Sequence, residues 1–316
     1  MSYDLYLYRR EGAKPLKKKG FQDYFKGRTN FTLKGIQAHY HNEKTGVYFT
    51  FDYNDGKGKD SDPEDPHAVH EHIYLNVNYF RPHIFGLEVE RILTALVKDL
   101  DLVVSDPQNE GMGDGEYTPE GFLRGWNAGN RFGHQAYLAM EQKGETLIPQ
   151  HHVLPAKTLR ACWEWTYGID ALYEHFHADD IDVFIPRVMY ALCDGKLQTL
   201  CVWPQLIPMA LPVVDLVLVM RNELPKRFAK GVDPANAVVP WKEVRKAASA
   251  FEVISGKKAP GLKYLLLDYG KAENAPPELV EFVRRLPAFS GQLQLIATDQ
   301  ILDEELVREC APKPRE

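Results

Sequence analysis

Residues 31–53, FTLKGIQAHYHNEKTGVYFTFDY, decide the fold expected for the first half of the chain. They predict two aromatic-rich strands, Phe31–His41 and Gly46–Tyr53, joined as a hairpin through residues 42–46. Upstream, residues 3–8 (YDLYLY) alternate aromatic and aliphatic side chains, which is the pattern of a further strand. Downstream, Ile73–Phe80 predicts another strand, which is ended by the Arg-Pro pair that follows it. An antiparallel sheet is therefore expected.

Helical patterns follow these strands and predict the layer that covers the sheet. Residues 87–100 place apolar side chains at helical spacing. Thr118, Pro119 and Glu120 combine a hydroxyl cap, a proline in the first turn and an acid at the positive end, which predicts a helix start. Residues 21–25 predict one more short helix. The N-terminal half is expected to be an antiparallel sheet with packed helices.

A polar stretch without periodicity, residues 143–155, separates the two halves of the chain. We therefore expect an N-terminal α+β domain over 1–145 and a second domain over 156–316. In the second half, residues 183–193 and 197–203 predict strands of a hairpin around Asp194 and Gly195. Strand and helix patterns then alternate to the C-terminus, which indicates βαβ units and some parallel pairing. The fold class expected is α+β, with a mixed α/β C-terminal half.

Composition limits the classes of partner. The chain has 316 residues, 44% of them hydrophobic, which is enough for two domains with ordinary cores. Its net charge of −6 argues against duplex nucleic acid, since binding phosphates needs a clustered cationic surface. The most apolar run, residues 210–220, is about half of the roughly 20 residues that a membrane span needs. Neither nucleic acid nor a membrane is expected as a partner.

The four cysteines and the first residues indicate a cytoplasmic protein. Cys162, Cys193, Cys201 and Cys310 show neither CxxC spacing nor a disulfide framework. The opening residues, MSYD, lack the basic and apolar regions of a secretory signal. We expect a cytoplasmic location and no cofactor.

An acidic, glycine-containing stretch after the hairpin is the candidate partner-binding surface. Its proposed contact residues are Asp52, Tyr53, Asp55, Asp60, Asp62, Glu64 and Asp65. Such a stretch could occupy the basic groove of a nuclease or steer a cationic partner. A solvated hairpin tip is the favoured explanation, and Lys57 and Lys59 among the acids weaken mimicry of a phosphate chain. The spacing does not fit a calcium loop.

Three closely spaced imidazoles, His67, His70 and His72, form the sharpest candidate metal site. Histidines at this spacing, with a nearby aspartate, could hold zinc or nickel. The alternative is a solvated loop that runs into a strand, where His70 and His72 would share one face. Because HExxH is absent and no cysteine lies close, no metal site is assigned.

Glycines recur every fourth residue at Gly121, Gly125, Gly129 and Gly133. On a helix they form a bare stripe, at a cost of about 1 kcal/mol each relative to alanine. This cost is usually offset because a glycine surface lets other groups of the protein approach the helix backbone closely. We favour packing within the protein over the docking of a partner element.

No sequence motif indicates a catalytic centre. The glycine-rich residues 111–115 match neither phosphate-binding signature, and no GxSxG elbow is present. A triad assembled only by folding stays possible, because such groups meet in space and not in sequence.

Two stretches in the first half of the chain carry a resemblance to a known family. One is residues 1–10, MSYDLYLYRR; the other is residues 75–82, LNVNYFRP, followed by FGLE at 85–88, LDL at 100–102 and DPQ at 106–108. These stretches resemble the immunity proteins of type VI secretion effectors and related polymorphic toxins, particularly nucleases. The resemblance covers about the first 140 residues.

The resemblance implies a non-enzymatic inhibitor that binds its cognate toxin and neutralises it by occlusion, with no catalytic residues of its own. Two alternatives stay open. One is a metal-dependent hydrolase, or an immunity protein that acts enzymatically, using His67, His70 and His72. The other is a non-catalytic scaffold or adaptor.

Overall fold

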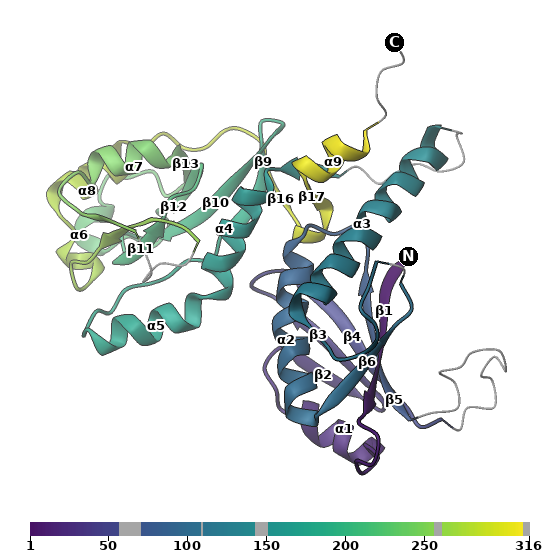
Figure 1. The fold of residues 1–316 in the computed structure, drawn as a ribbon. Helices are drawn as coiled ribbons and strands as arrows, with labels where there is room; N and C mark the ends of the chain where they lie inside the picture. Colours follow the sequence, from purple (N-terminus) through teal and green to yellow (C-terminus); the bar gives the residue numbers. More distant parts are fainter. Residues whose placement is uncertain (57–70, 109, 143–150, 256–260, 312–316) are drawn as a thin grey trace. The chain divides into compact units, whose positions relative to one another are not determined.

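The chain divides into two compact units in the computed structural model, which describes residues 1–56, 71–108, 110–142, 151–255 and 261–311 (Figure 1). Unit 1 comprises residues 1–156 together with the segment from Thr298 onward, and unit 2 comprises Lys157–Ala297. The sequence prediction placed everything after residue 156 in the second domain. The structure instead returns the C-terminal segment to unit 1.

Strand pairing and hydrogen bonds between residues far apart in the sequence hold the returning segment on unit 1. Strand β17 (Ile301–Asp303) pairs in parallel with β8 (His152–Leu154). The Thr298 hydroxyl donates a 2.8 Å hydrogen bond to the carbonyl oxygen of Thr45. Helix α9 (Glu304–Cys310) follows and lies beside α3 (Pro119–Gln142). A pairing of two three-residue strands so far apart in the chain leaves no local pattern for sequence analysis to detect.

A seven-stranded sheet in the order β2-β3-β4-β5-β1-β6-β7 forms the centre of unit 1. Every neighbouring pair is antiparallel, which confirms the predicted sheet. The strands are β1 (Ser2–Arg9), β2 (Phe31–Lys34), β3 (Gln37–Asn42), β4 (Val47–Asn54), β5 (His72–Asn78), β6 (Leu102–Asp106) and β7 (Gly113–Gly115). The predicted strand 31–41 is divided in two because Gly35, at φ 64°, makes a turn in its middle.

Three helices cover one face of this sheet, the inner face. They are α1 (Lys18–Phe25), α2 (Ile84–Leu100) and α3, and Figure 1 shows α2 and α3 crossing the same side of the strands. Phe25 of α1 stacks on Phe51 of β4, and Phe122 of α3 packs against Tyr3 of β1. The alternation of β1 and β4 sends these aromatic side chains into the core and the intervening residues to the opposite face.

The glycine stripe of α3 packs inside unit 1, as the sequence analysis favoured. A Cβ atom at Gly125 would overlap the hydroxyl of Tyr3, and one at Gly129 would overlap the hydroxyl of Tyr79. A Cβ at Gly121 would meet the side chain of Met112. The bare helix surface therefore lets two tyrosine rings of the core reach the helix backbone, which is the compensation for the low helix propensity of glycine.

Unit 2 holds a mixed five-stranded sheet in the order β13-β12-β10-β9-β16 and a three-stranded antiparallel sheet, β11-β15-β14. Strands β10 and β12 are parallel, which confirms the expected parallel pairing. The strands are β9 (Met189–Cys193), β10 (Lys196–Pro204), β11 (Met209–Pro212), β12 (Leu216–Met220), β13 (Ala237–Pro240), β14 (Val253–Ile254), β15 (Tyr264–Leu267) and β16 (Leu293–Ile296). The helices are α4 (Ala156–Tyr167), α5 (Ile169–Ala178), α6 (Lys226–Ala229), α7 (Trp241–Ala247) and α8 (Pro277–Arg285).

The hairpin predicted around Asp194 and Gly195 is confirmed as β9 and β10, and both turn residues have positive φ. Its first strand begins at Met189, six residues later than predicted. The preceding backbone is bonded to α4 instead, because Trp165 donates to the carbonyl oxygen of Pro186 and Thr166 accepts from the amide of Val188.

Candidate functional site

The face of the unit 1 sheet opposite the helices, here named the outer face, carries polar and aromatic side chains in rows across the strands. One row runs from Gln37 through Asp52, Tyr74 and Tyr6 to Ser105. The next row runs through His39, Thr50, Asn76 and Asp4. Directly opposed residues of antiparallel strands have Cβ atoms about 5 Å apart, so the two rows make one continuous surface. The outer face is defined by eight half-buried residues: Asp4, Tyr6, Tyr8, His39, Thr50, Asp52, Tyr74 and Asn76.

Asp4 is the centre of a hydrogen-bond network on the outer face. Its Oδ1 accepts from the hydroxyl of Tyr74 and from Nδ2 of Asn76, both at 2.7 Å. Its Oδ2 accepts from the Ser2 hydroxyl at 3.0 Å. Burial, and then the bond to Asp4, raise the pKa of Tyr74, so the phenol keeps its proton and holds the carboxylate in place. The network fixes one negative charge at a defined position on the sheet.

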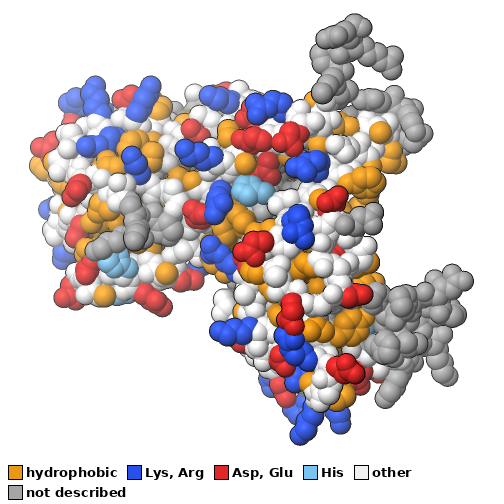
Figure 2. Space-filling view, in the orientation of Figure 1, with side chains coloured by type: hydrophobic (Ala, Val, Ile, Leu, Met, Phe, Trp, Pro, Cys, Tyr) orange, Lys and Arg blue, Asp and Glu red, His pale blue; other side chains and the backbone are white. Residues whose placement is uncertain are grey.

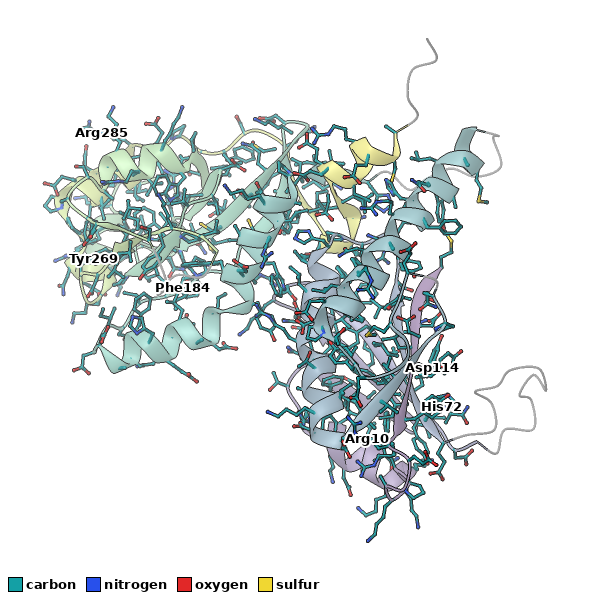
Figure 3. All side chains as sticks on the ribbon, in the orientation of Figure 1. Arg10, His72, Asp114, Phe184, Tyr269 and Arg285 are labelled. Carbon is teal, nitrogen blue, oxygen red and sulfur yellow. The ribbon has the colours of Figure 1, made fainter. Side chains whose placement is uncertain are left out.

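A row of aromatic rings extends along the outer face from Tyr74, the tyrosine that donates to Asp4. The ring of Tyr6 lies 5.4 Å from that of Tyr74, and His72 lies 5.3 Å from Tyr6 and 5.4 Å from Tyr8. His72, labelled in Figure 3, is only 6% exposed. Tyrosine rings lose little conformational entropy on contact and offer both apolar area and a hydrogen-bonding group, which suits them to protein interfaces.

The structure separates the predicted partner-binding residues. Asp52 lies on the outer face, where Nε2 of Gln37 donates to it at 3.0 Å and burial raises its pKa. Asp55 is exposed just beyond the end of β4. Tyr53 does not belong to this surface: it is 4% exposed and packs on Phe21 in the core. Asp60, Asp62, Glu64 and Asp65 lie outside the described residues.

Of the three candidate metal ligands, the structure describes only His72. His67 and His70 lie outside the described residues, and His72 is enclosed by Tyr6 and Tyr8. Within the part of the chain that the structure describes, no three His, Cys, Asp or Glu side chains come together as metal ligands do.

A second polar cluster, which the sequence analysis missed, holds the segment between β5 and α2. Phe80 has φ 64°, an unusual conformation for a bulky residue, and its amide donates to Oδ1 of Asn130 at 2.7 Å. Nδ2 of Asn130 donates back to the carbonyl oxygen of Arg81 at 2.9 Å. Arg81 in turn donates to the hydroxyl of Tyr48, which donates to Asp299. The sequence signal was Arg81-Pro82, interpreted only as the end of a strand.

His83, which is partly exposed, and the buried Asp303 form a hydrogen-bonded pair beside this cluster. Nδ1 of His83 lies 2.6 Å from Oδ1 of Asp303, and the His83 amide donates to Oδ2 at 2.8 Å. A carboxylate that orients an imidazole is two thirds of a catalytic triad. Among the described residues, however, no hydroxyl or thiol is hydrogen-bonded to the His83 ring. The pair therefore serves to tie α2 to the returning C-terminal segment.

The cysteines are poor nucleophiles. Burial raises the pKa of Cys162 to about 12 and raises that of Cys201 as well. Burial is also the first cause of the raised pKa values of Cys193 and Cys310. Since the thiolate is the reactive form, all four side chains are held in the unreactive thiol form near neutral pH.

Comparison with known proteins gives no match: no family model, curated protein or solved structure is similar to this chain. The resemblance to immunity proteins therefore stays a prediction. None of the described helices combines the length and apolar character that crossing a bilayer requires.

Proposed function

We propose that this protein binds a cognate protein toxin and neutralises it by occlusion, and that the outer face of unit 1 is the contact surface. The single observation that supports this most is the row of tyrosine side chains on an ordered sheet face, Tyr74, Tyr6 and Tyr8, in which Tyr74 holds the carboxylate of Asp4. An occluding protein needs an ordered surface with aromatic anchors, and it needs no chemistry of its own.

The charge of the outer face favours a cationic partner. Asp4 and Asp52 are its two carboxylates, and the exposed Asp55 comes directly after the end of β4, the strand that carries Asp52. A nuclease presents a cationic groove to the phosphates of its substrate, so a rigid acidic surface complements it. A standard interface buries about 800 Å² on each partner, which is comparable to the area of a sheet face several strands wide.

The direct test is complex formation with the toxin encoded beside the gene of this protein. We expect the two purified proteins to elute together on size exclusion and the toxin to lose activity. Tyr6→Ala combined with Asp52→Lys should weaken the complex by about a hundredfold or more, because it removes an anchor and reverses a charge. Asp52→Lys alone should mainly slow association, by several-fold at low salt.

The matched control is Asp23→Asn on α1, because Asp23 is exposed and pairs with Lys19 on the same helix. This variant should bind like the wild type. Separate elution of the two proteins, or equal affinity of the control and the Tyr6→Ala, Asp52→Lys variant, would contradict the proposal.

The alternatives are separated by two simple measurements. A metal-dependent hydrolase, or an enzymatic immunity protein using His67, His70 and His72, requires close to one metal equivalent by elemental analysis after gentle purification. A scaffold or adaptor requires a stable partner that is not a toxin. If a toxin co-purifies with the wild type and does not co-purify with the Tyr6→Ala, Asp52→Lys variant, the proposed inhibitor is distinguished from both alternatives.

A further inference from the structure

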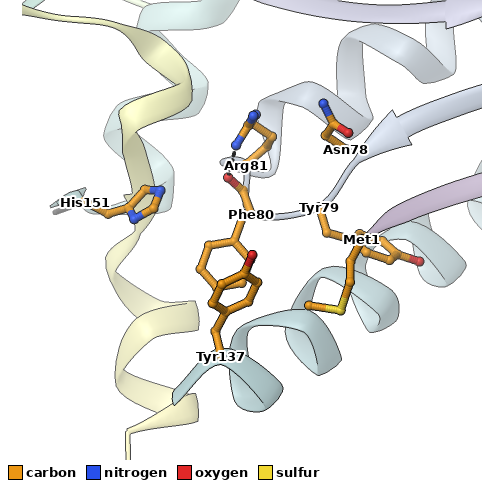
Figure 4. Close-up of a pocket in the computed structure, with 7 residues that line it drawn as sticks. All are labelled: Met1, Asn78, Tyr79, Phe80, Arg81, Tyr137 and His151. Carbon is orange, nitrogen blue, oxygen red and sulfur yellow. Dashed lines mark hydrogen bonds between the residues drawn. The ribbon is translucent and has the colours of Figure 1, made fainter. Parts of the chain in front are cut away.

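Two pockets lie side by side along α3 and form what we name the α3 groove. The larger has a volume of about 910 Å³, and Arg124, Ala128 and Phe132 of α3 line it. The smaller has a volume of about 270 Å³ and is lined by Arg81, Tyr137 and His151, among others (Figure 4). Met1 and Tyr79 line both pockets, so the two adjoin.

The lining of the α3 groove is cationic in a chain whose net charge is −6. Arg81, Arg124 and Arg131 line it, against one carboxylate, that of Glu110. Arg124 donates to the carbonyl oxygens of Glu110 and Gly111, at 3.2 and 3.0 Å. These acceptors are neutral, and among the described residues neither Arg81 nor Arg124 forms an ion pair with a carboxylate. Their charges are therefore not neutralised locally.

Arg131 is the third cation of the groove. Its Nε lies 3.3 Å from Oε2 of Glu309, and both side chains are about half exposed. An exposed pair of this kind contributes little free energy, about 0–1 kcal/mol, so a carboxylate from a partner can replace Glu309 at small cost.

Apolar side chains stand beside these cations. Phe132 is 68% exposed and Met1 is 61% exposed, and both line the larger pocket. Figure 2 shows hydrophobic side chains gathered over the C-terminal half of α3. An exposed phenyl ring next to a pocket, rimmed by charged residues, is typical of a contact surface.

We infer that the α3 groove docks an acidic segment of a partner protein, with an apolar side chain of that segment packed on Phe132 and its carboxylates placed at Arg124 and Arg131. Nucleic acid fits less well, because the groove offers few cations and includes the carboxylate of Glu110. The inference does not depend on the proposed function, since the outer face is acidic and takes a cationic partner.

The experiment selects binders from a displayed library of random 12-residue peptides against the full chain. We expect the selected sequences to be enriched in Asp and Glu together with an aromatic or aliphatic residue. In fluorescence anisotropy, the selected peptide should bind Arg124→Gln and Phe132→Ser about tenfold or more weakly than wild type.

The matched control is Arg160→Gln in unit 2, whose side chain is exposed and pairs with Glu164. This variant should bind the peptide like wild type, as should Asp52→Lys on the outer face. The inference is overturned if the selected peptides carry no acidic bias, if Phe132→Ser binds them as tightly as wild type, or if a 12-nucleotide single strand binds the groove more tightly than they do.

Discussion

The carboxylate of Glu88 on α2 accepts a 2.8 Å hydrogen bond from the hydroxyl of Tyr40 on β3, inside unit 1. The same oxygen accepts from Nδ2 of Asn42 at 2.8 Å and from the hydroxyl of Thr45 at 3.1 Å. Glu88 is fully buried. One side chain thus fastens a helix of the inner layer to the hairpin formed by β3 and β4, because a buried carboxylate is stable only with such donors.

Glu88→Ala should lower the free energy of unfolding of unit 1 by about 3 kcal/mol, because it leaves buried donors without their acceptor. Glu88→Gln should cost less, about 1–2 kcal/mol, since it keeps one acceptor oxygen and loses the charge. Urea denaturation followed by tryptophan fluorescence measures both. Glu11→Ala, at an exposed turn, is the control. Equal stability of Glu88→Ala and this control would contradict the prediction.

Two glycines of the α3 stripe should respond to alanine in opposite directions. A Cβ at Gly129 would overlap the Tyr79 hydroxyl, whereas a Cβ at Gly133 would find its nearest neighbour at 3.6 Å. Gly129→Ala should therefore destabilise unit 1 by about 1–3 kcal/mol. Gly133→Ala should stabilise it by up to about 1 kcal/mol through helix propensity. Thermal denaturation of the two variants checks the sign, and a common sign would refute the packing argument.

Local periodicity was enough to predict the sheet and most helices, because long strands such as β1 and β4 alternate between buried and half-buried side chains. It could not predict that β1 lies between β5 and β6, since strand order depends on contacts between distant segments. For the same reason it missed the return of residues 298–311 to unit 1.

The candidate site shows where the sequence information ends. Asp52 and Tyr53 are neighbours in β4, so their side chains must point to opposite faces, and only Asp52 reaches the outer face. This conflict was visible in the sequence. The network of Asp4 with Tyr74 and Asn76 was not, because it exists only once β1 pairs with β5.

The stability of unit 1 should fall as the pH falls below about 6.5. Burial lowers the pKa of His134 below its usual 6.5, so the folded protein keeps the imidazole neutral. The unfolded chain binds a proton there first, and the excess of protons on the unfolded state reduces the free energy of unfolding. His134→Gln should flatten this dependence between about pH 7 and pH 5. Denaturation at several pH values measures it, and a slope for His134→Gln equal to that of the wild type would contradict the prediction.

Arg221 should be the residue of unit 2 that tolerates substitution least. It is 2% exposed, and its Nε donates to the carbonyl oxygen of Ala235 at 2.8 Å while Nη1 donates to that of Leu286 at 2.6 Å. Leu286 ends α8, where the carbonyl groups carry the negative end of the helix dipole.

Arg221→Ala should lower the free energy of unfolding of unit 2 by about 3 kcal/mol. The substitution leaves these buried carbonyl oxygens without a hydrogen-bond donor and creates a cavity. Arg221→Lys should restore only part of this, since a single ammonium group cannot bond in both directions at once with the geometry of the planar guanidinium. Hydrogen exchange of the α8 amides, which should speed up in both variants, is the local measurement. Arg285→Ala, at a side chain that is 78% exposed and labelled in Figure 3, is the matched control. Unchanged exchange in Arg221→Ala would show that the buried guanidinium does not hold the end of α8.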